Sequence, residues 1–436
     1  MDIIRYQKST FIHTFACGLW MLLSCATASA QKYVGGDISM LPAYEKAGAD
    51  YYSHSGKAMN DVLGFLKDEG WNAMRVRLFV NPQQQTTTHN GQWVSDANVC
   101  QDIEWVKTLG KRIKDKGLKF MLDIHYSDTW ADPGKQWTPA AWASLSDDAL
   151  AAKVYNYTKD MLEQLKAAGA KPDMVQTGNE ISYGMLWGRP NGSLYQCWPS
   201  SSTSNWNRFE KLLAQATKAT RETCPEAKII VHVERVSTSQ QKDNKGYTAL
   251  KNFYQKMTAA NIDYDVIGLS YYPYFHGSMS ELEGAISYLE KTYPQKDIMV
   301  VETGYPYAWA VGGTNFDYQK TYPYTDEGQR KFTADLVTML NKHAKVNGLF
   351  WWWPEYNAKG TSLSGWYNAP LFDSNTGRAT SALSEMKEFL TTPTAIKDIA
   401  VGKTTSDNGY YNLLGQYASH PRHGVFIRQG KKTVIR

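Results

Sequence analysis

Short apolar segments recur along the chain, and each is followed by a longer stretch with amphipathic helical spacing. The apolar segments, which we predict to be strands, lie at 33–38, 73–79, 118–124, 173–177, 228–233, 265–270, 297–301 and 346–352. The helical stretches lie near 57–70, 98–116, 147–169, 206–223, 246–260, 279–292, 326–345 and 379–390. Regular alternation of short strands with helices predicts βαβ units and a parallel sheet.

The number of these units indicates the fold class. Eight strand–helix units in about 360 residues match the α/β class in its (β/α)8 form, the TIM barrel. An open doubly wound sheet would show the same alternation with fewer units, and no G-x-G-x-x-G motif follows the first strand. We therefore predict a catalytic-type barrel over residues 31–392, followed by a small C-terminal β-type tail at 393–436.

The N-terminal segment is typical of an export signal. A basic start precedes an apolar stretch from Phe11 to Cys25, and small residues follow, so we predict a signal peptide at 1–30. Ala28-Ser29-Ala30 fits ordinary signal peptidase, whereas Leu22-Leu23-Ser24-Cys25 resembles a lipobox, which would make Cys25 a lipid anchor. Both alternatives predict an exported protein that is periplasmic, on the cell surface or secreted. No later stretch approaches the roughly 20 apolar residues of a transmembrane helix.

The positive net charge does not predict a nucleic-acid partner. The chain carries a formal charge of +5, but the first 30 residues contribute +1 and residues 395–436 contribute +5. The predicted barrel is left at −1, so a basic groove for nucleic acid is not expected there. Removal of the leader leaves Cys100, Cys197 and Cys224, which allow at most one disulfide and form no zinc-binding motif.

Aromatic residues are unusually frequent and point to another class of ligand. The chain has 15 Trp and 28 Tyr, and many of them lie in polar segments rich in Gly and Pro. Burial in an apolar core explains such positions poorly, whereas stacking on the faces of sugar rings would explain them.

Polar and aromatic side chains gather where the predicted strands end. In a TIM barrel these ends form the face that carries the active site. The residues there are Asp37, Arg75, Arg77, Asp123, His125, Asn179, Glu180, His232, Tyr271, Tyr272, Glu302, Trp351 and Trp352. A barrel with only a structural role has no reason to combine these side chains at one rim.

Two glutamates stand out in this set because each ends an apolar strand. MVQTGNEISY (174–183) contains Glu180, and IMVVETGYP (298–306) contains Glu302. A single glutamate at a strand end is usually just solvated, but the fourth and seventh strands lie on opposite sides of the ring, so this pair can face each other. Glycosidic bond cleavage requires such a pair, an acid behind the leaving oxygen and a carboxylate beneath the anomeric carbon.

The neighbouring residues suggest the role of each carboxylate. We expect Glu180 to be the acid/base, with its pKa raised by the negative charge of Glu302. Glu302 should be the nucleophile, kept ionised by Arg75 and by the hydroxyl of Tyr271. Asn179 is expected to hold the sugar 2-hydroxyl. Of the pair Tyr271-Tyr272, one side chain should face the pocket and the other the barrel wall.

Longer segments resemble a known family. GWNAMRVRLFVNP, MLDIHYSDTWADPGKQWTPAAW, TGNEISYGMLW, DYDVIGLSYYPYFHG and VVETGYPY are similar to the arabinogalactan endo-β-1,4-galactanases of glycoside hydrolase family 53, in order and spacing over about 33–391. The resemblance implies a retaining (β/α)8 hydrolase with Glu180 as acid/base and Glu302 as nucleophile.

The resemblance also implies substrate contacts around this pair. Those residues are Arg75, Asp123, His125, Asp128, Trp130, Asn179, Tyr271 and Trp352. Arg75 is preferred over Arg77 because it stands in N-A-M-R, as in the wider clan, although both should lie on the same face of their strand. Trp352 is expected to form the floor of the sugar site before the scissile bond.

The chain departs from the family pattern at two places. Some bacterial members carry an acidic calcium loop after the seventh strand, but here AWAVGGTNFD (308–317) has one acidic residue, so we expect no metal and no cofactor. The last strand of the family usually reads aromatic-Trp-Glu-Pro, whereas this chain has Trp351-Trp352-Trp353-Pro354. The role of Trp353 stays open at this stage.

The expected activity is retaining endo-hydrolysis of β-1,4-galactan in the type I arabinogalactan side chains of pectin, by a monomer acting on a polysaccharide. The alternatives are another β-glycanase of the same clan, such as a mannanase, and a non-catalytic glycan-binding surface protein. The intact Asn179-Glu180 pair and Glu302 argue against the last alternative, since binding alone needs no facing carboxylates.

The C-terminal segment GYYNLLGQYASHPRHGVFIRQGKKTVIR predicts short strands with a turn near Gln429-Gly430. It resembles the C-terminal segments of secreted Bacteroidetes proteins, which implies a small β-domain or a sorting signal. A basic flexible tail is the alternative.

Overall fold

The computed structural model describes most of the chain. The described residues are 31–82, 87–89, 92–94, 96–190, 192–197, 203–238, 247–308, 310–357, 369–391, 410–412, 417–418, 424–428 and 431–435. The predicted leader at 1–30, with Cys25, lies outside them, as does the first part of the predicted tail. The chain divides into two compact units, Met1–Leu390 and Thr391–Arg436, which are described separately.

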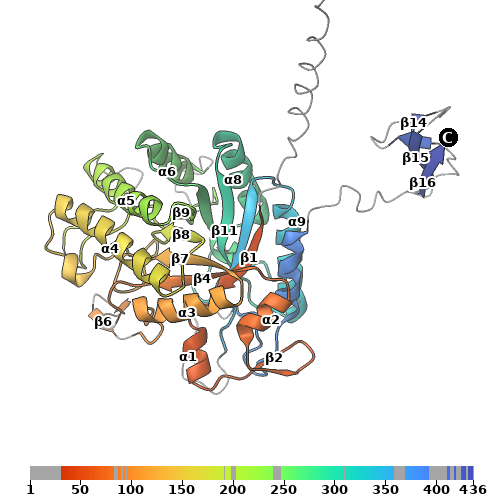
Figure 1. Ribbon diagram of the computed structural model, residues 1–436, viewed down its shortest axis with the longest axis horizontal. Helices are drawn as coiled ribbons and strands as arrows, with labels where there is room; N and C mark the ends of the chain where they lie inside the picture. The colour runs from red at the N-terminus through yellow and green to blue at the C-terminus, as the bar shows by residue number, and fades with distance from the viewer. Residues whose placement is uncertain are drawn as a thin grey trace, which may run out of the picture. The chain divides into compact units, whose positions relative to one another are not determined.

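The first unit contains a closed barrel of eight parallel strands (Figure 1), as the strand–helix alternation predicts. Around the barrel the strand order is β1-β12-β11-β10-β9-β8-β7-β4. The strands are β1 (Tyr33–Asp37), β4 (Ala73–Leu78), β7 (Lys119–Ile124), β8 (Met174–Thr177), β9 (Lys228–Val233), β10 (Val266–Tyr271), β11 (Asp297–Thr303) and β12 (Val346–Trp351). Two small antiparallel pairs lie outside the barrel, β2 (Tyr51–Tyr52) with β3 (Ala58–Met59) and β5 (Thr87–His89) with β6 (Gln92–Val94).

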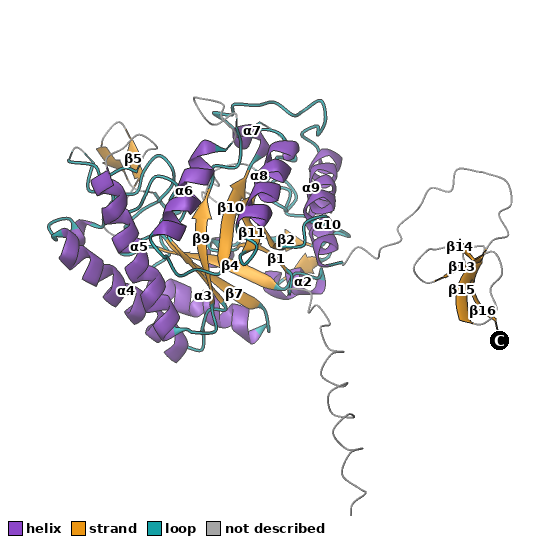
Figure 2. Cartoon of the chain, turned by 90° about the horizontal axis from the view of Figure 1, so that it is seen from above, coloured by secondary structure: helices purple, strands orange, loops and turns teal. Residues whose placement is uncertain are grey.

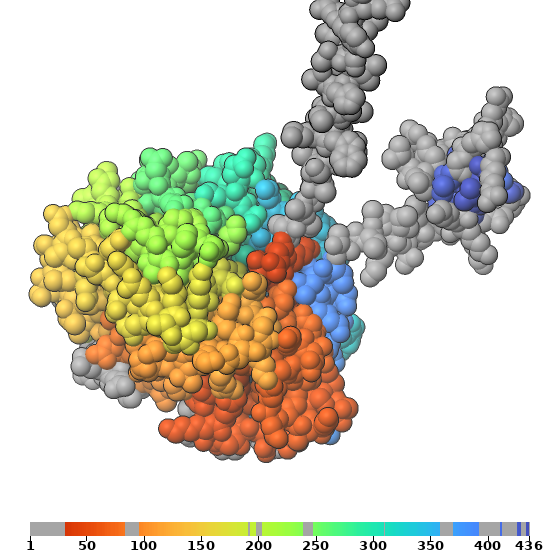
Figure 3. All heavy atoms as spheres, viewed as in Figure 1, coloured from red at the N-terminus to blue at the C-terminus, as the bar shows by residue number. Residues whose placement is uncertain are grey.

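Helices cover the outside of the barrel (Figure 2). They are α1 (Leu41–Lys46), α2 (Val62–Asp68), α3 (Ile103–Asp115), α4 (Asp147–Ala167), α5 (Thr203–Thr223), α6 (Thr248–Ala259), α7 (Pro273–His276), α8 (Met279–Thr292), α9 (Asp326–Leu340) and α10 (Ser381–Glu385), with 3-10 turns at Ala140–Trp142 and Met386–Leu390. In Figure 3 the segments that carry α3, α4 and α5 lie side by side on one face, coloured orange to yellow-green. The helix predicted near 147 begins at Asp147, where the hydroxyl of Ser146 accepts a hydrogen bond from Ala149 N.

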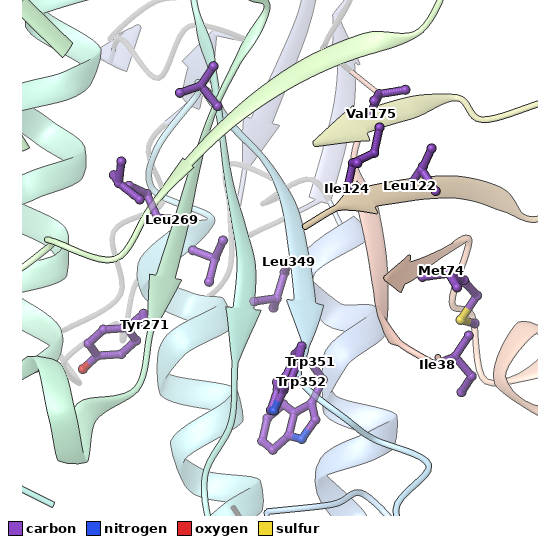
Figure 4. Packing of buried hydrophobic residues seen from close by; sticks show 14 of the residues in the cluster. Ile38, Met74, Leu122, Ile124, Val175, Leu269, Tyr271, Leu349, Trp351 and Trp352 are labelled. Carbon is purple, nitrogen blue, oxygen red and sulfur yellow. The ribbon is translucent and has the colours of Figure 1, made fainter. Parts of the chain in front are cut away.

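Alternate residues of each strand face opposite sides of the barrel wall. Met74, Leu122 and Val175, labelled in Figure 4, belong to the large apolar cluster that also contains helix residues such as Val106 and Leu162. The residues that face inward form a separate apolar layer inside the barrel: Ala73, Met121, Met174, Ile230, Val266, Met299, Val301 and Phe350. The period of two therefore determines which side chains can reach the axis of the barrel.

The first strand closes the barrel by pairing with β12 on one side and β4 on the other. A Cβ atom on Gly35 would lie 1.9 Å from the carbonyl oxygen of Ala73. Only glycine therefore allows β1 and β4 to approach this closely.

A buried carboxyl group supports this closure. Glu355 follows β12, its Oε1 accepts a hydrogen bond from Met40 N at 2.9 Å, and its backbone carbonyl accepts one from Tyr51 Oη at 2.6 Å. Glu355 has no exposed surface. Burial, reinforced by the negative charge of Asp37, raises its pKa to about 8. At neutral pH, Glu355 therefore holds a proton while it joins the end of β12 to the start of α1.

The second unit contains short strands, as predicted for the tail. They are β13 (Tyr410–Asn412), β14 (Tyr417–Ala418), β15 (Gly424–Arg428) and β16 (Lys431–Ile435), in an antiparallel sheet of order β14-β13-β15-β16. Within this sheet, Arg428 Nη1 donates a hydrogen bond to Tyr410 Oη at 2.9 Å.

Cys100, Cys197 and Cys224 are free thiols. Among the residues that the structure describes, none of the helices has the length and apolar character needed to cross a membrane.

The buried Glu355 generates a prediction about stability and pH. Its pKa in the folded protein exceeds the ordinary value of 4.5, so the native state binds more protons than the unfolded state between these two values. The stabilisation is full below about pH 4.5 and declines as the pH rises towards 8, with a slope of up to about 1.4 kcal/mol per pH unit. In Glu355→Gln the contribution of this group should disappear, so stability should fall less steeply with pH than in the wild type, while the raised pKa values of Glu180 and Glu302 still contribute. Urea unfolding at pH 5, 6.5 and 8 would measure the difference in slope.

Glu163→Gln, on the exposed face of α4, is the matched control and should keep the wild-type slope. Equal slopes for the wild type and Glu355→Gln would show that Glu355 is already ionised in the native state.

Candidate active site

A polar layer lies directly above the apolar layer, at the C-terminal ends of the strands. It consists of inward-facing residues from successive strands: Asp37, Arg75, Arg77, Asp123, Gln176, His232, Ser270 and Glu302. Each of these residues is at most 5% exposed. Buried polar groups at this density require partners, and the contacts within the layer decide how each carboxylate behaves.

Glu180 is directed into the barrel by an unusual backbone turn. It follows β8 by three residues and has φ +47°, while Gly178 before it has φ +101°. A non-glycine residue in the left-handed region costs on the order of 1 kcal/mol. The turn is held in place by Ile181 N, which donates to the carbonyl of His232 at 3.0 Å. As a result, Glu180 Oε1 accepts a hydrogen bond from Ser270 Oγ at 2.7 Å.

Glu302 reaches the same layer because of a β-bulge. The pairing of β10 with β11 shifts register, so that Leu269 lies opposite Val300 but Ser270 lies opposite Glu302. Val301 fills the apolar interior, and strict alternation would turn Glu302 outward. The extra residue lets two consecutive side chains face the barrel interior. The bulge therefore places the Glu302 carboxylate in the polar layer.

Arg75 is the principal partner of Glu302. Its Nη2 lies 2.8 Å from Glu302 Oε1, and the same guanidinium pairs with Asp37 at 2.9 Å and Asp123 at 2.8 Å. Arg75 Nη2 also donates to Asn179 Oδ1 at 2.9 Å. The expected contact of Arg75 with Glu302 is thus present. Because Arg75 has no exposed surface, it orients the carboxylate and leaves sugar contact to other groups.

The environments of the two glutamates differ electrostatically. Burial raises the pKa of Glu180 well above its ordinary value, and the negative charge of Glu302 raises it further. Burial also raises the pKa of Glu302, but Arg75 opposes that rise, as does the hydrogen bond from Tyr272. Glu180 is therefore the group that retains a proton, and Glu302 is the group that ionises more readily.

The prediction for Tyr271 is wrong. Tyr272 Oη donates to Glu302 Oε2 at 3.0 Å, whereas Tyr271 Oη donates to the carbonyl of Gly277 at 3.2 Å. Tyr271 has the same parity along β10 as Leu269, which packs against the helices; in Figure 4 the ring of Tyr271 extends away from Trp352. Alternation along β10 puts Ser270 and Tyr272 on the inner face instead.

Asp123 and His125 support the site from below. Asp123 has no exposed surface and its oxygens are occupied by Arg75, by Gln176 Nε2 at 2.6 Å and by His125 Nε2 at 3.0 Å. His125 Nδ1 accepts a hydrogen bond from Ala131 N at 3.1 Å. Asp123 and His125 are thus held among protein groups, and their direct contact with sugar stays a prediction.

Asp128 is likewise held by the protein. It is 4% exposed, and its Oδ2 accepts a hydrogen bond from Ala140 N at 2.8 Å. Burial raises the pKa of its carboxyl group. Asp128 therefore fixes the loop after β7 instead of standing free at the rim.

Three tryptophans and one arginine form an aromatic cluster at the rim. The Arg77 guanidinium lies 4.8 Å from the ring centroids of Trp130 and Trp352, and 5.1 Å from that of Trp353. Trp130 is the partly exposed member and donates from Nε1 to Asp96 Oδ2 at 2.8 Å. Trp353, whose role the sequence leaves open, has φ +58° and is part of this cluster. The cluster keeps Trp130 and Trp352 in fixed orientations.

Several residues around the two glutamates are not evident from the sequence. Gln176, Ser270 and Glu234 were not identified as candidates, although Gln176 and Ser270 have the inward parity of their strands. Glu234 is 2% exposed, accepts a hydrogen bond from Ser182 Oγ at 2.6 Å, and adds to the rise in the pKa of Glu180. The period of two could have pointed to Ser270, but only the fold brings it to Glu180.

Within the described parts of the chain, no three His, Cys, Asp or Glu side chains are grouped so that they could hold a metal ion. What the site does contain is one carboxyl group, Glu180, whose pKa lies well above its ordinary value. Beside it in the same layer is a second, Glu302, which is paired with Arg75 and accepts a hydrogen bond from Tyr272. This pairing can donate a proton to one atom while it stabilises or attacks an electron-poor centre next to it.

Comparison with known proteins agrees with this chemistry. The sequence profile of glycosyl hydrolase family 53 matches residues 33–386. The chain is 32% identical over 360 residues to the arabinogalactan endo-beta-1,4-galactanase of Thermothelomyces thermophilus, covering 81% of this chain and 98% of that protein. The protein of that name from Cellvibrio japonicus is 35% identical over 362 residues, covering 78% of this chain and 86% of its own length.

A solved structure described as the GH53 catalytic domain of Ignisphaera aggregans superposes with a TM-score of 0.68 and 31% identity, covering 82% of this chain and 96% of that one. The match of the profile extends over nearly the whole barrel, including both strand ends that carry the facing glutamates. The chain belongs to glycosyl hydrolase family 53.

Proposed function

We propose that the protein is an endo-β-1,4-galactanase that cleaves galactan and the type I arabinogalactan side chains of pectin with retention of configuration. The observation that carries this proposal is the pair Glu180 and Glu302, one favouring the protonated form and the other held by Arg75 and Tyr272. Family membership and relatives that are named galactanases support the choice of substrate.

In the first half of the reaction Glu302 attacks the anomeric carbon. A bond forms between its carboxylate oxygen and that carbon while the glycosidic bond breaks, and the leaving oxygen takes the proton from Glu180. Arg75 and Tyr272 hold Glu302 in place for the attack. The loss of negative charge on Glu302 then lowers the pKa of Glu180, which prepares it to act as a base.

In the second half Glu180 removes a proton from a water molecule. The water oxygen bonds to the anomeric carbon, the bond to Glu302 breaks, and Glu302 leaves as a carboxylate. Each carboxyl group returns to its starting state, and two inversions give net retention.

The rim residues suggest how the sugar is held. Asn179 Nδ2 donates to the carbonyl of Ala131 at 2.8 Å, and its second N–H can donate to the sugar 2-hydroxyl. The faces of Trp352 and Trp130 can stack on sugar rings, the usual role of aromatic side chains in such sites. No observation favours a mannanase or a purely glycan-binding protein over this assignment.

We further propose that residues 1–30 direct export, with processing after Ala30 or lipidation at Cys25, and that the C-terminal unit acts as a small β-domain or a sorting segment. The proposal rests on the sequence of the leader and on the short strands between Tyr410 and Ile435.

The first prediction concerns Glu180. Glu180→Ala should lower kcat/KM on galactan by about 10²–10⁴-fold, because general acid catalysis is lost. Aryl galactosides with good leaving groups need little protonation, so their glycosylation step should be largely spared, and azide should restore turnover as a β-galactosyl azide. Glu163→Ala on the exposed face of α4 serves as the control. Wild-type activity of Glu180→Ala on galactan would rule out this assignment.

The second prediction concerns stereochemistry and the nucleophile. Proton NMR during early hydrolysis should show β-configured reducing ends before mutarotation. A 2-fluoro-galactosyl inactivator should label Glu302, and mass spectrometry of the labelled peptide would locate the bond. Initial α-product would contradict the mechanism, whereas a label on another carboxylate would contradict only the choice of residue.

The third prediction concerns metal. The loop at 308–317 has a single acidic residue, Asp317. One carboxylate provides too few oxygen ligands for a typical calcium site. Treatment with EDTA should therefore change neither galactanase activity nor Tm appreciably. A Tm that falls by several degrees and recovers on addition of calcium would reveal ligands elsewhere in the chain.

A further inference from the structure

The two glutamates are connected across the polar layer inside the barrel by a continuous chain of buried polar contacts. From Glu302 it passes to Arg75 at 2.8 Å, then to Asp123 at 2.8 Å. Asp123 accepts from Gln176 Nε2 at 2.6 Å, and Gln176 lies 3.0 Å from His232 Nδ1. The chain ends with His232 Nε2 to Ser270 Oγ at 2.8 Å and Ser270 Oγ to Glu180 Oε1 at 2.7 Å.

The proton positions in the last part of this chain follow from its donors. Two N–H donors approach His232 Nδ1, the backbone N–H of Glu180 at 3.3 Å and Gln176 Nε2 at 3.0 Å. One acceptor, Asn179 Oδ1, lies 3.2 Å from the same nitrogen, but it already receives an N–H of Arg75 at 2.9 Å. We therefore assign Nδ1 as an acceptor. Burial and the nearby Arg75 keep the pKa of His232 well below its ordinary value, so the ring is neutral. A neutral ring that accepts at Nδ1 carries its proton on Nε2. His232 Nε2 therefore donates to Ser270 Oγ.

The hydroxyl group of Ser270 therefore donates its hydrogen bond to Glu180. A hydroxyl group has one proton, and because its oxygen receives the N–H of His232, the proton is directed to Glu180 Oε1. Both Ser270 and His232 have no exposed surface, so water does not compete for these bonds. The Oε1 atom of Glu180 thus accepts a hydrogen bond whether or not the carboxyl group is ionised.

We propose that Ser270 and His232 are positioning residues for the acid/base, which hold Oε1 of Glu180 as an acceptor and so keep its acidic proton on Oε2, the oxygen left for the glycosidic bond. This inference rests on the proposed function and deepens it. Without the pair, the proton could occupy the inner oxygen, where it cannot reach a leaving group.

The charged groups around Glu180 predict the direction of a pH effect. Glu302 on β11, Glu234 after β9 and Asp132 in the loop after β7 all raise the pKa of Glu180, and the Ser270 hydroxyl lowers it. Removal of that hydroxyl should raise the pKa of Glu180. The alkaline limb of kcat/KM against pH reports this group in the free enzyme, so the limb should move to higher pH.

The test is Ser270→Ala assayed on galactan and on an aryl β-galactoside with a good leaving group. On galactan, kcat should fall about tenfold to a hundredfold while KM changes by less than about threefold, and the alkaline limb should rise by about half a pH unit or more. On the activated aryl substrate, kcat/KM should stay within about threefold of the wild type, because that step needs little protonation.

Two further variants separate positioning from packing. His232→Gln places an N–H donor near the position of Nε2 and should retain more galactanase activity than His232→Leu. Thr158→Val removes a buried hydroxyl on the outer helix α4 that bonds to Val154 O at 2.8 Å, so it should lower Tm while leaving the pH profile unchanged.

The ¹⁵N NMR signals of His232, assigned by their loss in His232→Gln, should show the Nε2–H tautomer.

The outcomes distinguish this inference from the proposed function. A wild-type enzyme without activity on galactan would overturn the proposed function. An active wild type with an unmoved alkaline limb in Ser270→Ala, or with equal losses on both substrates, would overturn only the positioning role. A Nδ1–H tautomer of His232 would overturn the assigned direction of the hydrogen bonds.

Discussion

The buried guanidinium group of Arg75 is the constraint on which the active-site layer depends. It has no exposed surface and lies within 2.9 Å of carboxylate oxygens of Asp37, Asp123 and Glu302. A cation in the interior of a barrel is costly unless it is paired, and its removal would leave three acids facing one another. The positions of β1, β4, β7 and β11 at the rim are thus tied to a single side chain. Arg75 also makes the two glutamates unequal, since it contacts Glu302 and not Glu180.

Two departures from regular backbone geometry bring the glutamates into the same polar layer. Glu180 occupies the left-handed region after β8, and the bulge at Val301 turns Glu302 inward. Both conformations are less favourable than regular structure, and both are supported by buried hydrogen bonds or by interior packing. Irregular backbone therefore occurs where the chemistry requires a side chain that an ideal strand would direct elsewhere.

The aromatic cluster is held in place by a second buried arginine. Arg77 pairs with Asp37 at 2.7 Å and lies against three tryptophan rings. Trp353 thus adds a third aromatic ring beside Trp130 and Trp352. Polar and aromatic layers share Asp37 as a common partner, so the carboxylates and the stacking surface are oriented by one connected network.

The sequence by itself determined the barrel and the order of its strands and helices, because the spacing of apolar residues in a strand or helix depends only on nearby residues. It also determined that Glu180, Glu302 and Arg75 lie at the active face, because that face is formed by the ends of the strands. It left four matters to the tertiary structure. The bulge at Val301 depends on how β11 pairs with β10. The run of apolar residues in β11 would be the same without a bulge, so the sequence does not predict it. Asp123 ends its strand as a candidate ligand does, but Arg75 and Gln176 on the neighbouring strands bind its oxygens. Tyr272, and not Tyr271, contacts Glu302, because the closed barrel decides which alternate residues of β10 face inward. The contact of Ser270 with His232 and Glu180 joins two strands and the turn after a third, and only closure of the barrel brings such distant residues within hydrogen-bonding distance.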